Sequence, residues 1–192
     1  MTSELLWALS RASGLVLLPL FTLVVVLGVL THGGRRLGRS PRWVTPLVHR
    51  SLALAALGFL VVHVGSVVAD GYVDVSLLDV VVPFASGYRP FWTGLGTVAV
   101  LLLVAVVATS LARVRLGRRV WRAVHALAWP FLAVSLAHAL GVGSDTRTPW
   151  GLALSAACVV AVLTALAVGR RRDRWRPADP VRRPSVLQGS SR

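Results

Sequence analysis

The chain has 192 residues, of which 55% are hydrophobic and only 15% are charged, and its mean hydropathy is +0.71. A soluble domain of this size carries more polar surface, so the composition all but excludes a soluble globular enzyme. The net charge is +14, and every basic residue is an arginine. On so apolar a chain, this charge indicates a membrane protein with basic loops and argues against a nucleic-acid partner.

Five apolar stretches each approach the roughly 20 residues that an α-helix needs to cross the hydrocarbon core of a bilayer. They cover about residues 5–30, 45–69, 92–111, 120–142 and 149–168. The first stretch lacks a basic leading region and a small-residue cleavage site, so we expect it to remain as a span and not to be removed as a signal peptide. The sequence therefore predicts an all-α integral membrane protein, built as a five-helix transmembrane bundle.

The arginines predict the orientation of this bundle. All but three lie in or beside the loop after the first span, in or beside the loop after the third span, or in the tail. The three exceptions share the opposite side with most of the acidic residues. Because basic segments stay in the cytoplasm, we expect the N-terminus outside and the C-terminus inside. The exceptions are Arg11, Arg89 and Arg147, and the acids beside them are Glu4, Asp70, Asp74, Asp79 and Asp145.

The chain divides into a transmembrane domain, residues 1–169, and a basic tail, residues 170–192. The tail is rich in Arg, Pro and Ser and has little to bury, so we expect it to be a disordered cytoplasmic extension. Contact with anionic membrane lipid is its simplest role, and docking of a cytosolic donor is the alternative. No internal repeat is evident in the sequence.

Histidine is costly inside a bilayer, so histidines within spans are candidate functional residues. His49 and His63 fall on the second span and His125 and His138 on the fourth, whereas His32 lies at the cytoplasmic end of the first and is expected to be interfacial. The second and fourth spans run in the same direction. His49 can therefore face His125 near the cytoplasm, and His63 can face His138 near the outer surface.

The separation within each helix limits what these histidines can bind. Steps of 14 and 13 residues correspond to about 21 and 20 Å along a helix, which excludes one metal ion shared by all four side chains. Two haems stacked along the membrane normal fit the pattern, each with one axial imidazole from each helix. These haems would lie between the second and fourth spans.

Helical phase supports half of this arrangement. At about 100° per residue, the 14-residue step from His49 to His63 returns to nearly the same face, but the 13-residue step leaves His125 and His138 about 140° apart. A straight fourth span would not serve both haems. Pro130 lies between the two histidines, and its ring and missing N–H predict a kink that re-aims His138.

Two segments carry a resemblance to a known family. HRSLALAALGFLVVH, residues 49–63, and WRAVHALAW, residues 121–129, the latter continuing to His138, resemble the paired-histidine patterns of the ferric reductase-like transmembrane domain. That superfamily includes NADPH oxidases, ferric reductases and MsrQ-like haem-binding membrane subunits, and the chain looks like its short actinobacterial members over about residues 5–168. The resemblance implies two non-covalent b-type haems in a bacterial cytoplasmic membrane.

The implied function is transmembrane electron transfer. The superfamily usually has six spans where this chain has five expected ones, and the sequence contains no FAD or NAD(P)H module. We therefore expect a subunit that takes electrons from a separate flavin- or NAD(P)H-dependent donor, or from quinol, and passes them to an extracytoplasmic redox partner or ferric iron. With both axial positions filled, each iron would relay electrons and would not activate oxygen. Whether the chain is itself an enzyme stays open.

Three arginines are expected to pair with haem propionates, Arg50 and Arg122 at the inner haem and Arg11 at the outer haem. As boundary charges, the same residues would only set the topology. Two other functions are open. One is a stand-alone surface ferric reductase that delivers electrons to chelated iron at the acidic outer loop, residues 70–79; the other is a haem-free transporter or structural membrane protein whose histidines pack or carry protons.

Overall fold

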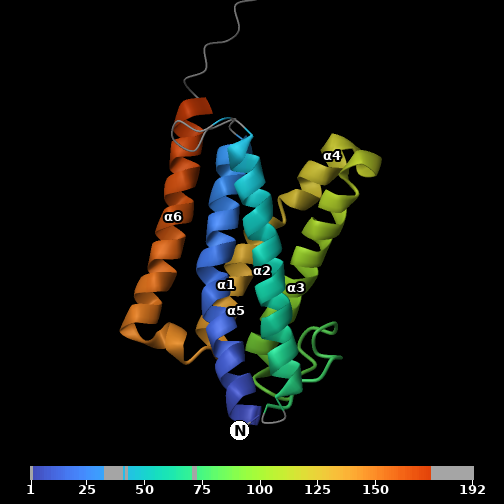
Figure 1. The fold of residues 1–192 in the computed structure, drawn as a ribbon, viewed down its shortest axis with the longest axis vertical. Helices are drawn as coiled ribbons and strands as arrows, with labels where there is room; N and C mark the ends of the chain where they lie inside the picture. The colour runs from blue at the N-terminus through green and yellow to red at the C-terminus, as the bar shows by residue number, and fades with distance from the viewer. Residues whose placement is uncertain (1, 33–40, 42, 71–72, 174–192) are drawn as a thin grey trace, which may run out of the picture.

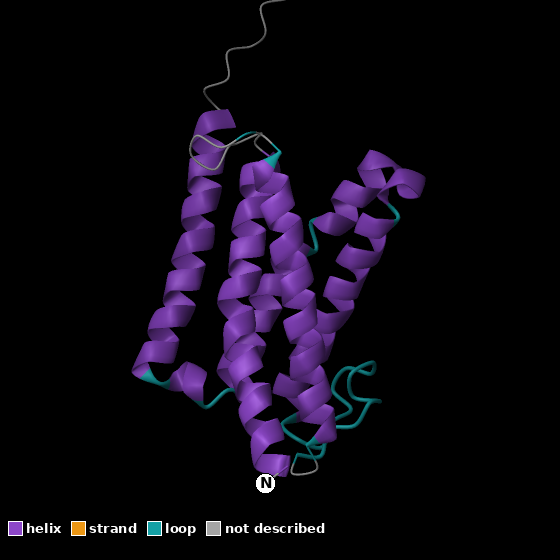
Figure 2. Ribbon diagram, viewed as in Figure 1, coloured by secondary structure: helices purple, strands orange, loops and turns teal. Residues whose placement is uncertain are grey.

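The computed structural model describes residues 2–32, 41, 43–70 and 73–173. Within these ranges the chain folds into helices and connecting loops (Figures 1 and 2), which confirms the all-α prediction. The elements in chain order are α1 (Thr2–His32), α2 (Val44–Ala69), α3 (Pro90–Leu111), α4 (Arg113–His125), α5 (Ala128–Val142), the short 3-10 turn η1 (Asp145–Arg147) and α6 (Pro149–Asp173).

Four of these helices, α1, α2, α3 and α6, are long and apolar enough to cross a membrane, and α4 with α5 makes a fifth crossing if the bent pair counts as one span. Their outward faces are apolar as well: Val61 on α2 is 73% exposed and Val104 on α3 is 57% exposed. A soluble protein would bury such side chains, whereas lipid solvates them. The described residues therefore form a multi-pass membrane protein whose helices contact lipid.

The fourth predicted span, residues 120–142, differs from the structure. A basic helix, α4, and an apolar helix, α5, meet there at an angle of 41°. Pro130 has no N–H to donate to the Ala126 carbonyl, which accepts a bond of 3.1 Å from the Trp129 N–H instead. The kink predicted at Pro130 is thus confirmed, and it takes the form of a break at Ala126 and Leu127 between the two helices.

The helices pack in two antiparallel pairs. α1 lies along α2, α3 lies along α5, and α6 covers the outer side of α1 (Figure 1). A small apolar core joins the pairs at mid-height, where the rings of Phe21 and Phe131 meet edge to face at 4.7 Å. Ala56 and Ala99 are buried in the same cluster, and their small side chains let α2 and α3 approach it closely.

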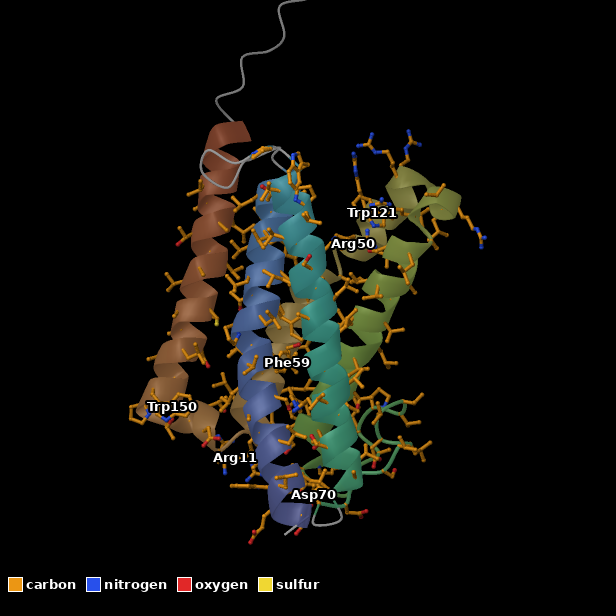
Figure 3. The ribbon with its side chains drawn as sticks, viewed as in Figure 1. Arg11, Arg50, Phe59, Asp70, Trp121 and Trp150 are labelled. Atoms are coloured by element: carbon orange, nitrogen blue, oxygen red, sulfur yellow. The ribbon has the colours of Figure 1, made fainter. Side chains whose placement is uncertain are left out.

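The two ends of the bundle differ in charge. At one end, called here the N-terminal end, α1 begins, the loop before α3 lies and α6 begins; Figure 3 places Arg11, Asp70 and Trp150 there. At the opposite end, called here the arginine-rich end, Figure 3 places Arg50 and Trp121. The exposed arginines of α4 gather at this second end: Arg113, Arg115, Arg118, Arg119 and Arg122.

Some predictions fall outside the described residues. These are the structure of the tail beyond Asp173, the arginines of the first loop and the environment of the His32 side chain. The loop arginines are Arg35, Arg36, Arg39 and Arg42.

Candidate paired-histidine site

A cavity of about 610 Å³ lies between the two helix pairs, in the half of the bundle nearer the N-terminal end. His63 of α2 and His138 of α5 both line it, and they are close enough to interact electrostatically. Leu18, Leu60 and Val100 are among the apolar side chains that make up most of the remaining wall. The volume is in the range of natural ligand pockets, about 300–1,000 Å³, and the pocket is apolar with two convergent imidazoles.

Each of these two histidines is held by a backbone carbonyl from the neighbouring helix. The Nδ1 of His63 lies 2.8 Å from the carbonyl oxygen of Ser10, and the Nδ1 of His138 lies 2.8 Å from that of Trp92. A carbonyl only accepts, so Nδ1 must carry the proton and donate it. The neutral ring then keeps its lone pair on Nε2, which is the tautomer of a metal-binding histidine whose other nitrogen is fixed by an outer partner.

The second pair of histidines lies nearer the arginine-rich end. His49 donates from Nδ1 to the Val24 carbonyl at 2.9 Å, and it is close enough to His125 for electrostatic interaction. The Nδ1 of His125 lies 3.3 Å from the hydroxyl of Ser110, and its ring lies against that of Trp121, with 5.0 Å between centroids. The structure thus brings together the two pairs that the sequence predicted, at two heights along the bundle.

The three predicted arginines lie at different ends. Arg11 is half-buried at the wall of the cavity, where its Nε donates to Asp145 at 2.8 Å and its Nη2 pairs with the other carboxylate oxygen. Its guanidinium also lies over the Trp7 ring, 4.2 Å from the centroid. Arg50 and Arg122 are exposed at the arginine-rich end.

Two further arginines at the N-terminal end were not predicted as site residues. Arg89 and Arg147 both donate to the carbonyl of Gly141, at 2.9 and 2.8 Å, and Arg147 also donates to the Leu140 carbonyl at 2.8 Å. They neutralise the negative C-terminal end of α5, a role typical of basic residues at a helix C-terminus. Together with Arg11 they line the cavity, and Asp70, Asp79 and Asp145 line it too, so basic and acidic side chains meet in its wall. The sequence did offer one signal for them: Arg89 and Arg147 lie with Arg11 on the side of the membrane where few arginines are expected.

Sequence reasoning also missed three glycines that face histidine rings. Gly14 faces His63, Gly28 faces His49 and Gly96 faces His138 across the helix contacts. Glycine is common in transmembrane helices, so single glycines gave no signal. The usable signal was the 14-residue step from Gly14 to Gly28, which equals the step from His49 to His63 on the antiparallel neighbour.

The histidine pairs are the strongest candidate donors in the structure. Within the described part of the chain, no three side chains of His, Cys, Asp or Glu gather around one point as a bare metal ion would require. Two imidazoles that line one largely apolar cavity, as His63 and His138 do, suit a different ligand. That ligand is a metal that brings its own equatorial donors in a large planar ring.

The chain matches one known protein family. Residues 5–145 match the family model described as Domain of unknown function (DUF8596), which covers most of the chain, so the protein belongs to this family. The matched region spans α1 to α5, contains all four span histidines and ends at Asp145, the partner of Arg11. No curated protein matches the chain, and no solved structure matches it.

Proposed function

We propose that the protein is a b-type cytochrome with two haems, a ferric reductase-like membrane subunit that relays electrons across the cytoplasmic membrane. One observation carries the proposal: His63 and His138 face one apolar cavity from separate helices, and each has its Nδ1 fixed by a backbone carbonyl. This leaves two Nε2 lone pairs, which would hold the iron of one haem.

The residues present fit a haem. The cavity between the helix pairs has mostly apolar walls for the macrocycle, and Arg11, Arg89 and Arg147 in its wall would face the carboxylates at the edge of the ring, each while keeping its protein partner. The carbonyl partners give each imidazole a defined tautomer and orientation before any ligand enters. When bound, haem supplies an iron that cycles between the ferric and ferrous states.

Two pairs of histidines would hold two such groups in series. His49 and His125 serve the site nearer the arginine-rich end, and His63 and His138 serve the site nearer the N-terminal end. The two levels on α2 are 14 residues apart, or about 21 Å along the helix. Phe21 and Phe131 pack between these levels and keep water out of the path.

The charge distribution gives the relay a direction. Basic segments favour the cytoplasmic side, so the arginine-rich end faces a cytosolic flavin- or NAD(P)H-dependent donor, or a quinol near that surface. The N-terminal end then faces the extracytoplasmic acceptor, either a redox protein or ferric iron. In this arrangement the chain collects no hydride itself and acts as the electron-transfer part of an oxidoreductase.

Burial in the outer loop favours a subunit over a stand-alone ferric reductase. The stand-alone alternative places chelated iron at the carboxylates of this loop, which would then have to lie on the surface. Asp70 and Asp79 are instead 3% and 8% exposed, and Asp79 accepts hydrogen bonds from the Ser76 N–H and hydroxyl at 2.7 and 2.9 Å. Asp74 is the remaining exposed acid of the described part of this segment.

Single histidine variants test the proposal. Reduced-minus-oxidised visible spectra of the detergent-purified chain, with haem counted per chain, should show two b-type haems in the wild type and one in His63→Ala or His138→Ala. His49→Ala and His125→Ala should lose the other haem, with a distinct spectral and potentiometric component. His32→Ala, which removes a histidine outside the pairs, should keep both. A wild-type chain that binds no haem, after expression with adequate haem supply, would leave the haem-free transporter or structural role.

A further inference from the structure

The same local arrangement holds three of the four span histidines. In each case the Nδ1 of the ring donates to a backbone carbonyl, and the residue four positions after that carbonyl is a glycine. Four residues are one helical turn, so the glycine lies directly beside the accepting carbonyl. The three sets are His63 with Ser10 and Gly14, His49 with Val24 and Gly28, and His138 with Trp92 and Gly96.

The glycines matter because the rings occupy the space of a side chain. A Cβ added at Gly14 would lie 2.9 Å from Cε1 of His63, and one added at Gly96 would lie 2.7 Å from Cε1 of His138. Both distances are too short for carbon atoms in contact, so the imidazole or the helix would have to shift, which disturbs the bond from Nδ1 to its carbonyl. At Gly28 the distance to Cε1 of His49 is 3.5 Å, an ordinary contact.

The fourth histidine follows the same register with one change. On α3, Ser110 lies 14 residues after Gly96, and Val106 lies 14 residues after Trp92. The Ser110 hydroxyl donates to the Val106 carbonyl at 2.6 Å and therefore stands between that carbonyl and the ring of His125, 3.3 Å away.

The hydroxyl has one proton and two lone pairs, and all are used. The proton goes to Val106, so Oγ accepts from Nδ1 of His125 and also from Nε1 of Trp121 at 3.4 Å. An oxygen shared by two donors at these distances polarises each N–H less than a carbonyl at 2.8–2.9 Å does. His125 is thus the least electron-donating of the four imidazoles.

We infer that Gly14, Gly96 and Ser110 are positioning residues for the histidine ligands. The two glycines admit the imidazoles to their carbonyls, and the serine raises the reduction potential of the site nearer the arginine-rich end. This inference rests on the proposed haem function. It adds that the two sites differ because α3 has Ser110 beside His125, whereas a glycine lies beside each of the other three histidines.

Glycine-to-alanine variants test the first half. Gly14→Ala and Gly96→Ala should each halve the haem content, from two per chain to one, with loss of the component that His63→Ala removes. Gly28→Ala should keep two haems because its added Cβ fits. Gly58→Ala and Gly65→Ala are matched controls, since nothing lies within 4 Å of a Cβ added at either position.

Glycines that only allow the helices to pack give a different result. Gly14→Ala and Gly96→Ala would then melt lower because of the added Cβ, but they would still hold two haems, as Gly58→Ala and Gly65→Ala do. Two haems with unchanged potentials in Gly14→Ala and Gly96→Ala would overturn the inference for the glycines.

Two serine variants test the second half by opposite shifts. Ser110→Gly opens the Val106 carbonyl to Nδ1 of His125, so the midpoint potential of one haem should fall. Ser110→Ala removes the acceptor, so the same midpoint should rise, while the other haem keeps its potential in both variants. Two bound haems with neither potential moved would overturn this inference and leave the proposed function intact.

A wild-type chain without haem would refute the proposed function separately. The positioning role is then read from ¹⁵N spectra of histidine-labelled chain. The His63 ring should be protonated at Nδ1 in the wild type and should lose that preference in Gly14→Ala; identical ring spectra in the two proteins would overturn the role.

Discussion

At the scale of single residues, the Arg11–Asp145 ion pair changes how the predicted propionate role of Arg11 is understood. The guanidinium lies at the cavity wall but is already held by a carboxylate through two contacts. A haem bound at this end of the cavity would therefore lie near two opposite charges, Arg11 and Asp145, whose electric fields largely cancel. Removing either partner exposes the other.

Opposite single substitutions at this pair should shift one potential in opposite directions. Arg11→Leu leaves the Asp145 carboxylate alone, so the midpoint potential of the haem nearer the N-terminal end should fall, and Asp145→Asn should raise it. Each variant should also lower the free energy of unfolding by about 1–3 kcal/mol, since a charged hydrogen-bonded partner is lost. Potentiometric titration followed in the visible spectrum measures the shifts. If both variants titrate as the wild type does, Arg11 has no electrostatic part in the site.

The histidines were predictable from sequence, and the residues that orient them were not. A histidine in an apolar run stands out because its burial is costly. Gly14 and Gly96 are ordinary transmembrane residues until a ring is placed beside them. Ser110 bonds back to its own helix, as serines in such helices usually do, and its contact with His125 depends on how α3 and α4 meet.

At the scale of helices, the break between α4 and α5 is the feature on which the site depends. Four spans were predicted to within a few residues because an apolar run of about 20 residues has one stable form in a bilayer. The break at Ala126 and Leu127 falls inside the predicted span, residues 120–142, where the basic α4 meets the apolar α5. In the sequence, only Pro130 indicated this break. The 13-residue step from His125 to His138 also called for a bend, because both side chains have to face the second span.

Restoring the missing N–H at Pro130 should straighten this region at the expense of the site. Pro130 lies in the first turn of α5, where proline is tolerated, and alanine is a good helix former, so Pro130→Ala should melt no lower than the wild type. In a straight helix, however, His125 and His138 point about 140° apart, and one of the two haems should be lost. Pro19→Ala is the control, because Pro19 lies inside the continuous α1. Two haems with wild-type potentials in Pro130→Ala would show that the bend has another cause.

At the scale of the whole molecule, the two helix pairs hold their histidines in a similar way, and this similarity is not evident in the sequence. α1 supplies carbonyls 14 residues apart to the histidines of α2. α3 supplies the Trp92 carbonyl to His138 and the Ser110 hydroxyl to His125, and Ser110 lies 14 residues after Gly96. The repeat consists of backbone acceptors and small residues, which leave little trace in a comparison of side chains. The cavity lies between the two pairs, and α6 packs outside on α1.

The most direct test of this account is the haem content of the purified wild-type chain, measured together with the spin state of the iron. If each histidine pair holds one haem, as we propose, the chain should contain two haems, both low-spin in the oxidised protein. One haem per chain would reduce the relay to a single site, and high-spin iron would show that the histidines do not pair. A chain free of haem would contradict the account altogether.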